Sequence, residues 1–158
     1  MRRGRIGLRT RVGNHGHLAT CLGIAALKQK PIRLLIVESD PSLASFWARH
    51  LSALGHSVEV CASACDGIAW LSRHPADVLV LDAELEEASG LAVADYAAVA
   101  RPETRVIVVT SAGVLSDGSI FSLSTNTCAQ VSAGARLDDL VALVEHHGNR
   151  ASASRPLP

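Results

Sequence analysis

Lysine is almost absent from this chain of 158 residues. Its two lysines are Lys28 and Lys30, so none follows residue 30. Aromatic residues are also scarce, with two Trp, two Phe and one Tyr, although 48% of all residues are hydrophobic. The core of a folded domain must therefore be built mainly from aliphatic side chains. The length suits one compact domain and leaves no room for a second globular one.

Cysteine and histidine do not occur in the spacings of common metal or redox motifs. The four cysteines, at positions 21, 61, 65 and 128, include no Cys-x-x-Cys pair, and the seven histidines include no His-Glu-x-x-His. We expect reduced, structural cysteines and a cytoplasmic protein. No run of residues approaches the roughly twenty apolar residues that span a bilayer, so no membrane partner is expected.

Basic and acidic residues are unevenly divided along the chain. Residues 1–33 hold eight of the fifteen Arg and Lys and no acid, whereas residues 34–158 hold seven basic residues against all fifteen acids. The low complexity of residues 1–30 predicts a flexible basic extension without a specific nucleic-acid partner. A globular domain is expected over residues 31–148, followed by a flexible tail at 149–158.

Short apolar runs alternate with helical patterns from residue 32 onward. Aliphatic runs without polar alternation are typical of strands that are buried on both faces. We therefore expect an α/β, flavodoxin-like, doubly wound parallel sheet of five strands in the order 2-1-3-4-5, with helices on both faces. Strands are predicted near 32–37, 57–61, 77–82, 105–110 and 127–131. Helices are predicted to begin near residues 41, 64, 91, 117 and 137, with Gly55 and Gly148 ending the first and the last.

Acidic residues follow the first and third predicted strands directly. Glu38 and Asp40 follow the first, and Asp82 and Glu84 end and follow the third. In such a sheet, ligands bind beyond the carboxyl ends of the strands where the strand order reverses, so Glu38 and Asp82 should share one crevice with Thr110 at its border. Carboxylates there indicate chemistry or metal binding. Alternatively, Asp40 caps the following helix and Asp82 caps a turn.

Three segments of the chain resemble the receiver domain of response regulators in two-component signalling. The resemblance covers about residues 31–148, and together the segments are fairly specific, whereas each alone is a weak signal. They are residues 34–41 (LLIVESDP), residues 76–82 (ADVLVLD) with SGL at 89–91, and residues 106–111 (VIVVTS).

The resemblance assigns roles to four residues. Asp82 matches the phosphoacceptor and Thr110 the switch hydroxyl, while Glu38, Asp82 and the Glu84 backbone carbonyl match ligands of Mg²⁺. An anionic carboxylate that attacks a phosphoryl group needs such a cation. The chain is thus expected to be a non-enzymatic, single-domain response regulator in a phosphorelay. It would receive a phosphoryl group from a histidine kinase or phosphotransfer protein and signal by binding another protein. The sequence leaves open whether the chain forms a homodimer.

Three positions depart from the pattern of that family. Ser39 replaces its main metal-binding carboxylate, Ser132 its phosphate-pairing lysine, and Ala129 its usual aromatic. Weak Mg²⁺ binding is expected, because Ser39 cannot supply the negative charge of the missing carboxylate. The attraction lost is about 4 kcal/mol for one charge pair at 4 Å and intermediate dielectric, before desolvation is subtracted. A phosphorylation-independent pseudo-receiver, a binding module, is the alternative. A haloacid dehalogenase-like phosphohydrolase, whose motifs residues 82–84 and 110–111 mimic, is less favoured because its chemistry needs a downstream lysine.

Overall fold

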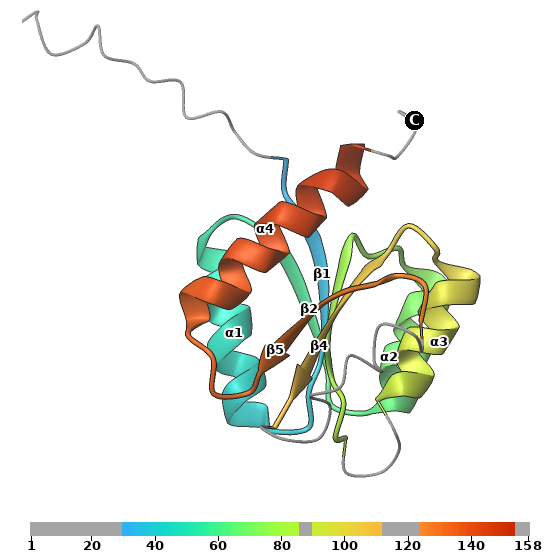
Figure 1. Cartoon of the computed structure of the whole chain (residues 1–158), viewed down its shortest axis with the longest axis horizontal. Coiled ribbons are helices and arrows are strands. Elements are labelled where there is room, and N and C mark those ends of the chain that lie inside the picture. Colours follow the sequence, from blue (N-terminus) through green and yellow to red (C-terminus); the bar gives the residue numbers. More distant parts are fainter. Residues whose placement is uncertain (1–29, 86–89, 112–123, 154–158) are drawn as a thin grey trace, which may run out of the picture.

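Five parallel strands form one sheet in the order β2-β1-β3-β4-β5, which confirms the expected topology and fold class. The computed structural model of the chain describes residues 30–85, 90–111 and 124–153. Figure 1 shows the sheet running through the middle of the molecule. The strands are β1 (Arg33–Val37), β2 (Ser57–Cys61), β3 (Val78–Asp82), β4 (Arg105–Thr110) and β5 (Thr127–Ser132).

Two helices cover each face of the sheet in the described part of the chain (Figure 1). The helix predicted near residues 117–123 and the basic extension before Lys30 lie outside the described residues. Every helix in the described ranges is too short or too polar to cross a membrane. The helices are α1 (Pro41–Ala53) and α4 (Leu137–Ala153) on one face, and α2 (Ala64–Arg73) and α3 (Leu91–Ala100) on the other.

The central strands are apolar throughout because both of their faces are covered. Alternate residues of a strand point to opposite faces. On β1, Leu35 and Val37 therefore join the core beneath α2 and α3, while Leu34 and Ile36 join the core beneath α1 and α4. The same division holds along β3. This double burial explains the absence of polar alternation in the sequence.

Helix α1 begins and ends where the sequence predicted. Asp40 Oδ1 accepts the backbone N–H groups of Ser42 at 2.8 Å and Leu43 at 3.2 Å, so the capping role of Asp40 is confirmed. At the other end Gly55 has a φ of 91°, a conformation that suits glycine after a helix. Its neighbour His56 donates its backbone N–H to the Leu51 carbonyl at 3.3 Å.

Helix α4 continues past the residue that was expected to end it. Gly148 lies inside the helix, so the prediction that it stops the helix is wrong, and residues 149–153 of the predicted tail are helical. A Cβ on Gly148 would lie 2.7 Å from Ile32 Cδ1. This glycine therefore lets the helix approach the sheet closely rather than turning the chain.

Gly90, which directly precedes α3, leaves no room for a side chain. A Cβ there would overlap the backbone carbonyl oxygen of Asp82. Because that backbone ends a central strand, Gly90→Ala should lower the free energy of unfolding by about 2 kcal/mol, measured by urea denaturation. Gly134→Ala is the matched control, since its Cβ would meet only Ser132 Oγ at 3.9 Å. Equal losses in both variants would contradict the prediction.

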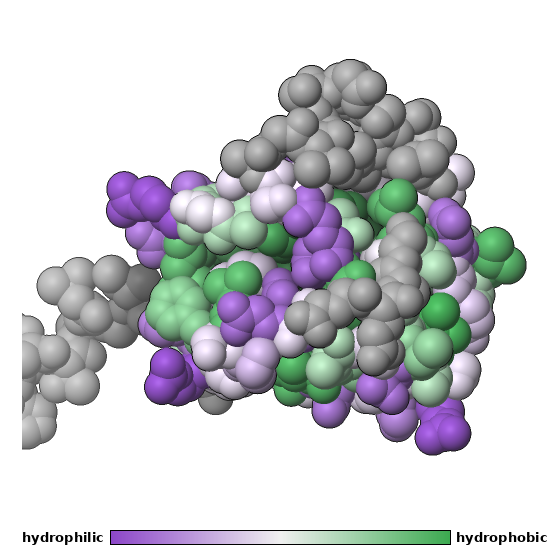
Figure 2. Space-filling model, turned by 90° about the horizontal axis from the view of Figure 1, so that it is seen from below, coloured by the Kyte–Doolittle hydropathy of each residue, from purple (hydrophilic) through white to green (hydrophobic). Residues whose placement is uncertain are grey.

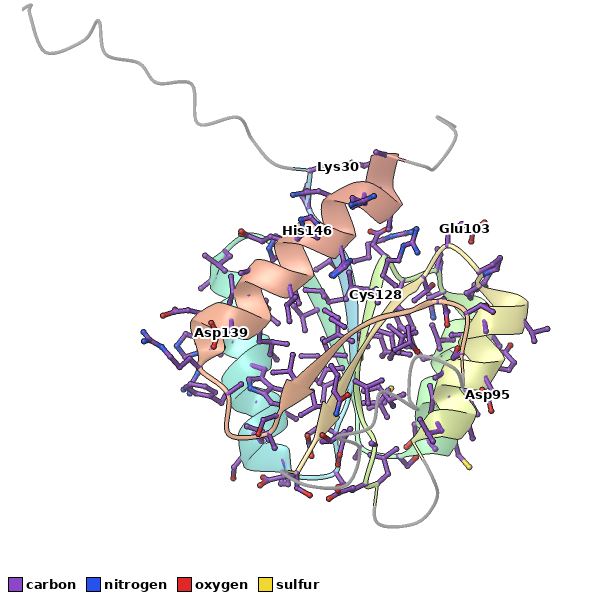
Figure 3. The ribbon with its side chains drawn as sticks, viewed as in Figure 1. Lys30, Asp95, Glu103, Cys128, Asp139 and His146 are labelled. Carbon is purple, nitrogen blue, oxygen red and sulfur yellow. The ribbon has the colours of Figure 1, made fainter. Side chains whose placement is uncertain are left out.

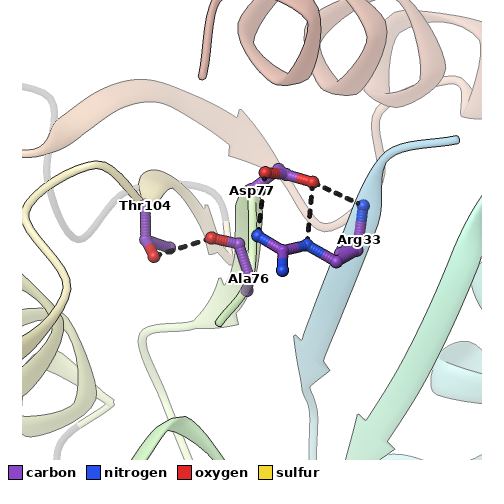
Figure 4. Close-up of polar contacts among 4 residues, drawn as sticks. All are labelled: Arg33, Ala76, Asp77 and Thr104. Atoms are coloured by element: carbon purple, nitrogen blue, oxygen red, sulfur yellow. Dashed lines mark hydrogen bonds and ion pairs between the residues drawn. The ribbon is translucent and has the colours of Figure 1, made fainter. Parts of the chain in front are cut away.

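An ion pair between a buried carboxylate and a partly exposed guanidinium joins β1 and β3 at their amino ends. The Asp77 side chain is 2% exposed and accepts hydrogen bonds from the backbone N–H of Arg33 at 2.9 Å, from Nε at 3.2 Å and from Nη2 at 3.3 Å (Figure 4). Nearby, Thr104 Oγ1 donates to the Ala76 carbonyl at 2.9 Å. The Arg33–Asp77 bonds tie the start of β1 to the start of β3, and the Thr104–Ala76 bond ties the start of β4 to that of β3. The register of β1 and β3 determines which residues meet at their carboxyl ends.

Candidate functional site at the strand ends

Glu38 and Asp82 lie at the carboxyl ends of neighbouring strands. Val37 of β1 pairs with Leu81 of β3 in parallel register, so the residue after each comes out at the same edge. Figure 2 views the molecule from this edge and shows hydrophilic groups near the middle of the face. Glu38 is buried, 5% exposed, while Asp82 is partly exposed. The topology thus brings together the two acids that the sequence placed in one crevice.

The carboxyl group of Glu38 is held in an unfavourable place for a negative charge. Burial raises its pKa, and the negative charges of Asp82 and Asp40 raise it further. The backbone N–H groups of Asp40 and Ser39 act in the opposite direction, and the first of them donates to Glu38 Oε1 at 3.0 Å. A cation beside these carboxyl groups would relieve the repulsion between them.

The Asp82 side chain is partly exposed and makes one local hydrogen bond. Its Oδ1 accepts the backbone N–H of Glu84 at 2.9 Å, which is the turn-capping role considered for this residue. That bond engages Oδ1, and the second oxygen is the one suited to a ligand or phosphoryl group. The side chain of Glu84 is engaged elsewhere, because Ser111 Oγ lies 2.6 Å from both of its carboxylate oxygens. The neighbouring acids Glu86 and Glu87 lie outside the described residues.

Thr110 ends β4 with its side chain inside the protein. The residue is 4% exposed and pairs with Ser132 of β5. Gln130 Nε2 donates a hydrogen bond to Thr110 Oγ1 at 3.3 Å. Sequence reasoning missed Gln130, although its position two residues before Ser132 places both on one face of β5.

The departures from the family pattern leave the described part of the site without a lysine. Ser132 is exposed, and its Oγ accepts the backbone N–H of Gly134 at 3.3 Å. Lys30, the single lysine in the described ranges, lies where β1 begins, at the opposite end of the sheet (Figure 3). Ala129 is 8% exposed in the core beneath α1 and α4. No described lysine can therefore pair with a group bound at Asp82.

The described oxygen donors near Glu38 and Asp82 are of the kind that binds Mg²⁺, but they are few. Across residues 30–85, 90–111 and 124–153, no three His, Cys, Asp or Glu side chains form a group that could hold a metal. Glu38 and Asp82 supply two carboxylates, and the family pattern adds the Glu84 carbonyl. Mg²⁺ prefers such oxygen ligands and commonly completes its shell with water. Because Ser39 replaces a third carboxylate, we expect weak binding.

Comparison with known protein families identifies the family of this chain. The model of the response regulator receiver domain matches residues 34–144. The chain belongs to the response regulator receiver domain family. It is therefore a receiver domain of two-component signalling, as its three motif segments predicted. Receiver domains interact with histidine kinases or phosphotransfer proteins.

The chain spans 60% or less of the two sequence relatives described next, which are longer proteins. The acid tolerance regulatory protein ActR of Rhizobium meliloti is 32% identical over 118 residues, which cover 74% of this chain and 60% of that protein. The transcriptional regulatory protein GlrR of Escherichia coli is 29% identical over 91 residues, 58% of this chain and 20% of that protein. A CheY-like receiver domain protein from Methanospirillum hungatei shares the fold, with a TM-score of 0.72, 24% identity and coverage of 80% of this chain and 100% of that chain.

Proposed function

We propose that this receiver domain accepts a phosphoryl group on Asp82 and signals by reversible binding to another protein. The observation that supports this proposal is the meeting of Glu38 and Asp82 at adjacent strand ends, one strand away from Thr110. These residue types are what acyl-phosphate chemistry requires: a nucleophilic carboxylate, a second carboxylate for a cation, and a hydroxyl donor. The phosphoryl donor would be a histidine kinase or a phosphotransfer protein.

Each residue would have a distinct part in the transfer. An oxygen of Asp82 forms a bond to phosphorus while the bond from phosphorus to the donor nitrogen breaks. Glu38, Asp82 and the Glu84 carbonyl would hold Mg²⁺, which supplies positive charge against the anionic reactants. Thr110 accepts a hydrogen bond from Gln130 and keeps its own hydrogen, which it can donate to a phosphoryl oxygen.

Acetyl phosphate tests the proposal without a cognate kinase. The chain is incubated with acetyl phosphate, with and without Mg²⁺, and its intact mass is measured. We expect a mass increase of one phosphoryl group that requires Mg²⁺ at a high concentration. Absence of any increase at every Mg²⁺ concentration would overturn the proposal.

The exposed Ser132 favours a second candidate function, a pseudo-receiver that binds its partner without phosphate. The described part of the chain offers no lysine to pair with a phosphoryl group, because Lys30 lies at the far end of the sheet. Such a module would keep the fold and its protein-binding role and would show no phosphoryl uptake. The acetyl phosphate experiment therefore separates the two functions.

Gln130 should control the direction of the hydrogen bond at Thr110. In Gln130→Glu the ionised carboxylate can only accept, so Thr110 would turn its hydrogen toward residue 130 and away from a phosphoryl oxygen. We expect the phosphorylated fraction at a fixed acetyl phosphate concentration to fall about tenfold, as for loss of one hydrogen bond to a charged group. Gln130→Met is the control, since it leaves the Thr110 hydrogen free. Equal phosphorylation of both variants would refute the role of Gln130.

A further inference from the structure

His56 is a buried histidine whose ring has no hydrogen-bond partner among the described residues. Its side chain is 4% exposed, and neither Nδ1 nor Nε2 makes a hydrogen bond there. Buried polar groups in proteins are nearly always bonded, and each exception calls for an explanation. The residue stands between α1 and β2 and lies against α4.

Glu145 of α4 is the charged group whose field acts on this ring. Its Oε1 lies 3.9 Å from His56 Nε2, too far for a hydrogen bond and close enough for an ion pair once the ring is protonated. From the α1 side the Leu51 carbonyl is already bonded to the His56 backbone N–H. Burial lowers the pKa of His56, and the weaker attraction of Glu145 opposes that effect.

The carboxyl-terminal half of α4 is closely seated on the sheet beside this ring. Val144, Gly148 and Ala151 are buried, and Gly148 brings the helix backbone against Ile32. Protein interiors that are packed this closely leave few voids that water could enter to solvate a charged imidazole. Solvation of the charged ring therefore requires the ring or the helix to move outward.

We propose that His56 is a proton-operated latch for α4. With a neutral ring, the carboxyl-terminal half of α4 stays seated. When the ring gains a proton, it turns toward water and that half of the helix lifts from the sheet. Acid would thus change the surface that α4 presents to partners, independently of Asp82.

The direction of the effect follows from the lowered pKa of His56. The unfolded chain and the lifted helix bind the proton more readily than the seated state does. The seating of α4 is therefore complete above about pH 6.5, the ordinary value of histidine, and weakens as the pH falls below it. His147 acts in the same direction, because burial and the positive charges of His146, Arg105 and Arg150 lower its pKa.

Hydrogen exchange on the full chain tests the latch. Amide protection in α4 is measured at about pH 7.5 and about pH 5.5 and corrected for the intrinsic exchange rate, with α2 on the other face as the internal reference. We expect the opening constant of α4 to rise several-fold in acid, with a limit of tenfold per unit of pH. In His56→Leu, α4 should respond less than in the wild type. His147→Gln and the exposed-site variant His50→Gln should keep the His56 response.

Two outcomes would overturn the latch: unchanged protection of α4 in acid, or an undiminished response in His56→Leu. If His56→Leu does not fold, the wild-type ring is titrated by NMR. A midpoint shared by the His56 ring signals and the α4 amide shifts supports the proposal. Different midpoints overturn it.

Discussion

Replacing Asp82 by Asn should abolish the uptake of a phosphoryl group from acetyl phosphate. Asn is nearly isosteric and its side-chain oxygen can still accept the Glu84 N–H that Asp82 accepts at 2.9 Å, so the turn after β3 should persist. What disappears is the negative oxygen that attacks phosphorus. We expect the mass increase to vanish at every Mg²⁺ concentration, while the midpoint of urea unfolding changes little.

Asp40→Asn is the matched control for that experiment. Asp40 belongs to the same acidic edge, but its Oδ1 caps α1, and Asn caps a helix about as well as Asp. The control therefore removes one negative charge near Glu38 and keeps the nucleophile. Phosphoryl uptake should persist in Asp40→Asn. Persistent uptake in Asp82→Asn would show that Asp82 is not the acceptor. Loss of uptake in both variants would show that the negative charge near Glu38, rather than the Asp82 oxygen alone, determines uptake.

Restoring a carboxylate at position 39 should raise the affinity for Mg²⁺ by at least tenfold. One added charge pair at 4 Å is worth about 4 kcal/mol at intermediate dielectric, and desolvation of the new carboxylate offsets part of it. Tenfold tighter binding needs only about 1.4 kcal/mol of that attraction. Ser39 is partly exposed, so a longer side chain can be accommodated there. Titration calorimetry of Ser39→Asp against the wild type measures the change.

Ser39→Asn separates charge from side-chain size. It adds a neutral side chain of nearly the same shape as Asp, with an oxygen that can still coordinate a cation. We expect it to leave Mg²⁺ affinity within a few-fold of the wild type. No gain for Asp would place the cation away from residue 39. The absence of a gain for Asp would contradict the Mg²⁺ site proposed at Glu38, Asp82 and the Glu84 carbonyl. Equal gains for Asp and Asn would show that coordination by a side-chain oxygen, and not the added charge, determines the affinity.

Local pattern was sufficient to predict most of the framework. The unbroken apolar runs predicted strands buried on both faces, and the right-handed connection of parallel strands limited their order to one that the structure confirms. The acids meet because they follow strands that this order makes neighbours. By the same reasoning Asp40 was recognised as a cap, since the proline and polar residues after it are typical of a helix start.

Glycine shows where local pattern was not sufficient. Gly55 and Gly148 look alike in the sequence, each following an apolar helical pattern. Gly55 does end its helix with a φ of 91°, whereas Gly148 lies inside α4 and meets Ile32. The difference arises from a neighbour that is distant along the chain. No helical periodicity carries information about such a neighbour.

The strands, their order and the meeting of Glu38 with Asp82 could thus be predicted from the sequence. The spacing of apolar residues and the handedness of the connections between strands depend on residues that are close along the chain. Only the tertiary structure shows the hydrogen bond from Gln130 to Thr110 and the burial of His56 beside Glu145. Each joins side chains from separate elements, so its geometry exists only after helices and strands have packed together.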